Sequence, residues 1–248
     1  IIVFIFGSIW GSFSNVCINR IPDNISVVQG RSHCPSCKKM INWYDNIPLI
    51  SFIILKAKCR SCSTKISSKY FLVELISAIS FVFIFYLFGF SLTTLLLFIL
   101  SISFIIIFFI DLKHFIIPNE ITYPLMVIGF IKSFDPNLNM DLFPDFMNSL
   151  IGGLFGYMII WLIIFIYKKL RDKEGMGLGD AKLLSVIGFW FGWVSIPFVM
   201  FFSSTVALLS ALPDLIKNKK NLSSQIPFGP YIIIGCLMFL VFNEQIKL

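Results

Sequence analysis

Long apolar segments constrain this sequence more than any other feature. At a rise of 1.5 Å per residue, about 20 helical residues cross a hydrocarbon core of roughly 30 Å. Only 13% of the residues are charged, whereas 57% are hydrophobic, which excludes a disordered tail, a disulfide-rich secreted module and an ordinary cytosolic enzyme. The sequence therefore predicts an all-α polytopic membrane protein with about eight transmembrane helices. The predicted spans are 1–18, 70–89, 92–110, 120–134, 149–167, 181–193, 195–212 and 228–243.

The apolar stretch 181–212 is longer than one membrane crossing requires. Gly192, Trp193, Ser195 and Pro197 interrupt it and are typical of an interfacial turn. We therefore expect two short spans here rather than one long helix.

The basic residues set the expected orientation. Strict alternation of the spans places 18 of the 20 Lys and Arg residues on one side, mainly in 19–69, 168–173 and 217–220. By the positive-inside rule that side is cytoplasmic. This distribution indicates a membrane rather than nucleic acid as the partner of the basic residues. We expect 1–18 to be a retained helix with its N-terminus outside, followed by a cytoplasmic domain at 19–69 and a membrane-embedded domain at 70–248.

The loop 19–69 carries two C-x-x-C pairs, Cys34 with Cys37 and Cys59 with Cys62. Two such turns close a tetrahedral zinc site, and metal binding would stabilise a loop that has little apolar area to bury. With all four ligand positions filled by protein, the zinc would be structural. The alternatives are two disulfides or four unbound thiols, and a reducing cytoplasm argues against disulfides. Cys17 and Cys236 lie in apolar spans and are interpreted as packing residues.

Two aspartates stand at ends of predicted spans on the cytoplasmic side. Asp111 ends the third span and Asp180 begins the sixth, after Gly175, Gly177 and Gly179. A carboxylate pair can hydrolyse a peptide, because one member deprotonates water while the protonated partner polarises the carbonyl. The alternatives are a solvated helix-end carboxylate for Asp111 and a helix N-cap for Asp180.

Eight short motifs make the sequence similar to the prepilin leader peptidases, the bifunctional membrane enzymes that mature type IV pilins and pseudopilins. Each motif is modest evidence, but their shared order along nearly the whole chain is specific. The motifs are Gly11-Ser-Phe-Ser-Asn-Val16 with Arg20-Ile-Pro22, Ser32-His-Cys-Pro-Ser-Cys37, Trp43-Tyr-Asp-Asn-Ile-Pro48, Cys59 to Cys62, Val73-Glu-Leu75, the run Asp111 to Asn119, Gly177-Leu-Gly-Asp-Ala-Lys182 and Pro227-Phe-Gly-Pro230.

The resemblance implies an aspartic endopeptidase of the Gly-x-Gly-Asp class with Asp111 and Asp180 as its catalytic residues. It also implies N-methylation of the new N-terminus with S-adenosylmethionine as methyl donor, and the loop with all four cysteines favours the bifunctional members. The expected partners are prepilin and pseudopilin precursors at the bacterial cytoplasmic (inner) membrane, with the active site facing the cytoplasm. No motif marks the methyl-donor site, and the sequence does not determine the oligomeric state.

Two other functions fit parts of the sequence. A presenilin-like intramembrane protease also uses Gly-x-Gly-Asp, but it predicts a Pro-Ala-Leu string where this chain has Ala211-Leu-Pro213, and it leaves the four cysteines unexplained. An ion-coupled transporter would also use intramembrane carboxylates, but the acidic pair is expected at one rim rather than at the midplane.

Overall fold

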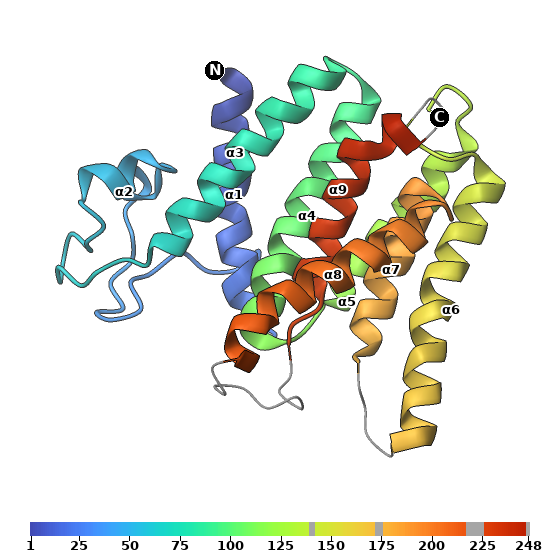
Figure 1. Cartoon of the computed structure of the whole chain (residues 1–248). Helices are drawn as coiled ribbons and strands as arrows, with labels where there is room; N and C mark the ends of the chain where they lie inside the picture. Colours follow the sequence, from blue (N-terminus) through green and yellow to red (C-terminus); the bar gives the residue numbers. More distant parts are fainter. Residues whose placement is uncertain (139–141, 172–175, 217–225, 247–248) are drawn as a thin grey trace. The chain divides into compact units, whose positions relative to one another are not determined.

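The computed structural model describes residues 1–138, 142–171, 176–216 and 226–246, so Gly175 and the basic run 217–220 lie outside the described residues. The described chain is helical and has no β-strand. It forms two compact units, Ile1–Ile106 and Ile107–Leu248, with the division inside α4. The elements are α1 (Ile2–Arg20), η1 (Trp43–Asn46), α2 (Ile50–Ile54), α3 (Ser68–Phe88), α4 (Leu92–His114), α5 (Asn119–Ile131), η2 (Lys132–Phe134), α6 (Phe146–Arg171), α7 (Leu178–Phe191), α8 (Ser195–Ile216) and α9 (Gly229–Ile246) (Figure 1).

All eight predicted spans fall on helices, and the prediction of an all-α membrane protein is confirmed. Among the described residues, five helices are long and apolar enough to cross a membrane, namely α1, α3, α4, α6 and the Ser195–Pro213 part of α8. The helices α5 and α7 have 13 and 14 residues, and the apolar part of α9 is Gly229–Phe242. The count of eight spans and the domain boundaries at 18 and 69 stay predictions.

The predicted break within 181–212 is present. The helix α7 ends at Phe191 and α8 begins at Ser195. Gly192 has φ +80°, a left-handed conformation that only glycine adopts without steric cost, and its N–H donates to the carbonyl of Gly188 at 2.8 Å. Gly192 and Trp193 lie in the predicted break, whereas Ser195 and Pro197 lie in the first turn of α8.

In the first unit, α1 and α3 pack as an antiparallel pair (Figure 1). Glycines on α1 let the backbones approach, since a Cβ at Gly11 would lie 2.6 Å from the Cα of Glu74. At the same interface Nδ2 of Asn15 donates to the carbonyl of Tyr70 at 3.0 Å. The loop 19–69 connects these two helices.

In the second unit, α6 and α7 run antiparallel and share the most extensive helix contact (Figure 1). Their backbones touch, because a Cβ at Gly188 would clash with the carbonyl of Gly152. Hydroxyl groups cross the interface: Ser149 donates to the carbonyl of Phe189 at 2.7 Å, and Ser185 to that of Gly153 at 2.8 Å. Close approach of small residues replaces hydrophobic burial as the source of helix affinity inside a membrane.

The C-terminal end of α7 is fixed by the segment that follows α5. The buried Lys132 donates from Nζ to the carbonyl of Trp190 at 3.0 Å, and its ammonium lies 3.9 Å from the ring centroid of Phe143. Nε1 of Trp190 donates to the carbonyl of Leu125 at 2.8 Å. The helix α7, which also contacts α8 and α9, is therefore held along its length by its neighbours.

Candidate functional site

Asp111 lies near the C-terminal end of α4, with 4% of its surface exposed. Its Oδ2 accepts a hydrogen bond of 2.9 Å from the backbone N–H of Gly229. Gly229 is the first residue of α9, so this oxygen sits at a helix N-terminus, where the free N–H groups and the helix dipole favour negative charge. The alternative of a solvated helix-end carboxylate is therefore wrong.

Asp180 is the third residue of α7 and is 9% exposed. The N-cap of α7 is Gly177, so the interpretation of Asp180 as an N-cap is wrong by three positions. The backbone N–H of Gly177 hydrogen-bonds to the Asp180 carboxyl, and the N–H of Asp180 donates to the carbonyl of Gly177 at 3.2 Å. These reciprocal bonds fix the carboxyl against the start of its own helix, as in a capping box.

Ile117 lies close to a neighbour of each acid, Gly179 beside Asp180 and Gly229 beside Asp111. A Cβ built on Gly179, beside Asp180, would lie 3.0 Å from Cβ of Ile117. A Cβ built on Gly229, beside Asp111, would lie 3.1 Å from Cδ1 of the same Ile117. The charge of Asp111 acts on the Asp180 carboxyl. Two buried carboxylates within electrostatic reach cannot both ionise cheaply, so such a pair shares a proton.

A hydrogen bond joins the starts of α5 and α7. Nζ of Lys182, two residues after Asp180, donates to Oδ1 of Asn119 at 2.7 Å. Asn119 begins α5, directly after the segment that connects it to Asp111 and α4. The side chain of Lys182 thereby links the start of α7, which carries Asp180, to the start of α5.

Three of these contacts were not predicted from the sequence, namely the amide of Gly229, the side chain of Ile117 and the link to Asn119. All three residues lie in strings that carry the family resemblance, Pro227-Phe-Gly-Pro230 and the run Asp111 to Asn119, but neither string indicates which atoms contact the acids. In each string a proline adjoins these residues: Pro118 lies between Ile117 and Asn119, and Pro230 follows Gly229.

The four cysteines predicted as metal ligands form one cluster in the first unit. Their Sγ atoms all lie within 4.8 Å of one another, and all are free thiols. The Sγ atoms of Cys34 and Cys62 are 3.8 Å apart. Four sulfur ligands at about 2.3 Å from a tetrahedral zinc ion are separated by about 3.8 Å. The residues present thus fit a zinc ion, and the disulfide alternative is not what the structure shows.

The two cysteine pairs sit on matching turns. The N–H of Cys34 donates to the carbonyl of Lys39 at 3.0 Å, and the N–H of Cys59 donates to the carbonyl of Thr64 at 2.9 Å. In both cases the acceptor is five residues after the cysteine. Lys38 and Ser63, at equivalent positions, have φ of 57° and 55°. This repeated geometry turns both sulfurs of each pair toward one centre.

The pKa values of the cysteines shift in opposite directions. Hydrogen bonds from the hydroxyl and the backbone N–H of Thr64 lower the pKa of Cys62 to about 6. At Cys37 the N–H of Lys39 favours the thiolate, but desolvation and the neighbouring cysteines outweigh it and raise the pKa to about 11. Four adjacent thiolates repel one another, and a divalent cation removes that repulsion.

Side chains of the loop tie this cluster to its surroundings. Arg60, inside the second C-x-x-C turn, makes the one ion pair found among the described residues, with Nη2 2.6 Å from Oδ1 of Asp45. Its Nε also donates to both oxygens of Asp45, so the pair is bidentate. Oε2 of Glu74 on α3 accepts from the N–H of Leu49 at 2.8 Å. The second C-x-x-C turn is therefore tied to η1 within the loop, and the loop is tied to α3.

Two family models match this chain. The model described as the bacterial Peptidase A24 N-terminal domain matches residues 5–88. The model described as the Type IV leader peptidase family matches residues 98–212, a range that contains both aspartates.

Curated proteins named prepilin leader peptidase/N-methyltransferase are similar over nearly the full chain. The protein of Aeromonas salmonicida strain A449 is 31% identical, over 99% of this chain and 91% of its own. The protein of Pseudomonas aeruginosa is 31% identical, over 98% of this chain and 90% of its own. The protein of Xanthomonas campestris pv. campestris is 33% identical, over 97% of this chain and 90% of its own. No solved structure matches the chain.

Proposed function

Because this chain belongs to the type IV leader peptidase family, we propose that it cleaves the leader from type IV prepilins and pseudopilins and methylates the new N-terminus. The family expected from the eight motifs is confirmed. The observation that supports a peptidase most directly is the pair of buried carboxylates, Asp111 and Asp180, whose neighbours Gly229 and Gly179 both lie close to Ile117. The catalytic roles of both residues are part of this proposal.

The contacts of the pair suggest a division of labour during hydrolysis. Oδ2 of Asp111 is engaged by the N–H of Gly229, so we assign the water to Oδ1. The carboxylate removes a proton from this water as it attacks the scissile carbonyl. The partner acid, Asp180, donates a hydrogen bond to the carbonyl oxygen and later transfers its proton to the leaving amine.

The expected position of the pair fits its substrate. A prepilin has a short basic leader followed by an apolar helix, so its scissile bond lies where that helix leaves the membrane. Both acids are at helix ends, and the positive-inside rule places those ends on the cytoplasmic side. We therefore propose a multi-pass protein of the bacterial inner membrane whose active site faces the cytoplasm.

Methyl transfer requires a donor, and we propose S-adenosylmethionine, which supplies an electrophilic methyl group to the new terminal amine. The support is that similar proteins are named N-methyltransferases. We assign no residue of this chain to the donor. The zinc that Cys34, Cys37, Cys59 and Cys62 would hold is structural, because four protein ligands leave no position for water.

Mass spectrometry of a reacted prepilin tests both activities at once. The full-length protein in lipid vesicles is incubated with a purified prepilin, with and without S-adenosylmethionine. We expect loss of the leader under both conditions and addition of one methyl group only with the donor. An intact precursor under both conditions would refute the peptidase, and a transporter would give that result. A cleaved but unmethylated product would refute the methyltransferase alone.

A further inference from the structure

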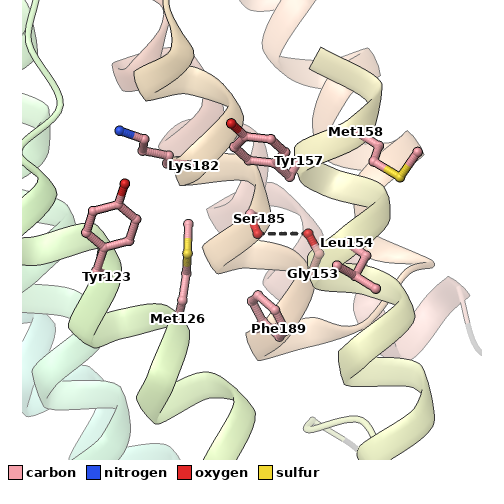
Figure 2. Close-up of a pocket in the computed structure, with 9 residues that line it drawn as sticks. All are labelled: Tyr123, Met126, Gly153, Leu154, Tyr157, Met158, Lys182, Ser185 and Phe189. Atoms are coloured by element: carbon pink, nitrogen blue, oxygen red, sulfur yellow. Dashed lines mark hydrogen bonds between the residues drawn. The ribbon is translucent and has the colours of Figure 1, made fainter. Parts of the chain in front are cut away.

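A cavity of about 300 Å³ opens between α5, α6 and α7 in the second unit. It lies on the other side of α7 from the acidic pair, because Lys182 follows Asp180 by two residues, or about 200° around a helix. The proposed peptidase reaction therefore does not use it. Its lining residues are Tyr123, Met126, Gly153, Leu154, Tyr157, Met158, Lys182, Ser185 and Phe189 (Figure 2).

The polar groups of the cavity gather at one end. Figure 2 shows the amine of Lys182 beside the hydroxyl of Tyr123, and the hydroxyl of Tyr157 in the same upper part of the view, near the start of α7. The ammonium of Lys182 uses one of its three donors on Asn119 and lies 5.2 Å from the ring centroid of Tyr123. Within the described part of the chain the one ion pair is Arg60 with Asp45, so Lys182 makes no ion pair with a described carboxylate. This end of the cavity is complementary to an anion.

The other end of the cavity is apolar. Met126, Leu154 and Phe189 line it from three different helices (Figure 2). The hydroxyl of Ser185 is already engaged, because it donates to the carbonyl of Gly153. A side chain at Gly153 would overlap the ring of Phe189, so the glycine leaves room for this wall. A free inorganic anion would leave the apolar end without a partner.

We propose that this cavity binds an anionic phospholipid. Its phosphate accepts hydrogen bonds from the ammonium of Lys182 and from a tyrosine hydroxyl, and one acyl chain lies along Met126, Leu154 and Phe189. The cavity borders α6, a helix long and apolar enough to span the bilayer, so a lipid reaches it from the hydrocarbon. Basic pockets between transmembrane helices on the cytoplasmic side recognise anionic headgroups in the same way. This inference does not depend on the peptidase function.

Native mass spectrometry of the full-length protein in a nonionic detergent tests the charged end. Phosphatidylglycerol and phosphatidylcholine with identical acyl chains are offered at equal concentration. We expect at least tenfold preference for phosphatidylglycerol, lost in Lys182→Gln and restored in Lys182→Arg. The matched control Lys113→Gln removes an exposed lysine at the end of α4 and should keep the preference. Equal retention of both lipids by the unsubstituted protein, or an unchanged preference in Lys182→Gln, would overturn the proposal.

A second pair of variants tests the apolar end and does not depend on Lys182. Leu154→Trp fills the cavity from an exposed position on α6 and should lower phosphatidylglycerol retention at least fivefold. Leu162→Trp adds the same bulk to an exposed position of α6 outside the cavity and should have no effect. Equal retention by the two variants would overturn the proposal. Displacement of the lipid by inorganic phosphate alone would show a simple anion site and would also overturn it.

Discussion

At the residue scale, Gly229 determines where the Asp111 carboxylate points. Its N–H holds Oδ2, and a Cβ at this position would lie 2.7 Å from that same oxygen. Gly229→Ala should therefore displace the carboxylate and lower prepilin cleavage at least tenfold. Leu237→Ala is the control, because it shortens an exposed side chain of the same helix α9, about two turns after Gly229.

Cleavage rates of the two alanine variants measure this effect. Methylation of a pilin whose leader has already been removed should be unchanged in both, which shows that they fold. If Gly229→Ala cleaves as fast as Leu237→Ala, the amide of Gly229 does not position Asp111.

The two acids could be found from the sequence because each is a charged residue at the end of an apolar segment. Gly229 could not, since it contacts Asp111 across 118 positions of sequence and through a backbone atom. A sequence pattern encodes side-chain chemistry and local periodicity, but it does not encode which amide a distant loop brings to a carboxylate. Ile117 was missed because its side chain is apolar, and nothing in the sequence distinguishes it from the adjacent Ile116.

At the element scale, the cysteine cluster predicts that the loop 19–69 folds around a metal ion. The double variant Cys34→Ser with Cys37→Ser should lower the zinc content, measured by elemental analysis, from about one ion per chain to near zero. The N–H groups of the loop should then exchange with deuterium faster, because metal binding supplies the folding free energy of small zinc modules. Cys17→Ala, in α1, should keep both the zinc and the slow exchange. Purified protein without zinc would contradict the assignment.

The contact between α6 and α7 depends on the absence of a side chain at Gly188. Gly188→Ala puts a methyl group against the carbonyl of Gly152 and should cost about 1–3 kcal/mol of unfolding free energy, the range for overpacking a close contact. Unfolding in mixed micelles measures the change. Leu162→Ala, at an exposed position of α6, serves as control. If both changes cost the same, the backbone contact is not what holds these helices together.

The sequence predicts the helices far better than their packing. Apolar length located all eight segments, and Gly192 marked the boundary of α7 and α8 because its φ is positive. The short helices α2 and η1 were not predicted, since a five-residue and a four-residue helix carry no periodic signal. The contacts of Gly188 and Lys132 depend on which helices become neighbours, and apolar length does not specify that.

At the scale of the whole molecule, the two candidate sites lie in different compact units. The four cysteines are in Ile1–Ile106, and both aspartates are in Ile107–Leu248. Loss of zinc in the double cysteine variant should therefore keep prepilin cleavage within about fivefold of the unsubstituted protein. The cleavage rate at saturating precursor measures this independence. A hundredfold loss, with the second unit still folded by deuterium exchange, would show that the zinc loop takes part in hydrolysis.

The central claim is that Asp111 and Asp180 act together as one acid pair. Cleavage of a prepilin by Asp111→Asn and Asp180→Asn, each in the full-length protein in vesicles, tests it most directly. Asp135→Asn, at the C-terminal end of η2, is the control for loss of a carboxylate elsewhere. We expect each of the first two variants to lose at least about hundredfold in cleavage rate, the scale of one general acid or base. Both should still methylate a pilin that has no leader, and Asp135→Asn should cleave normally. A rate above one tenth of normal in either Asp111→Asn or Asp180→Asn would contradict the claim.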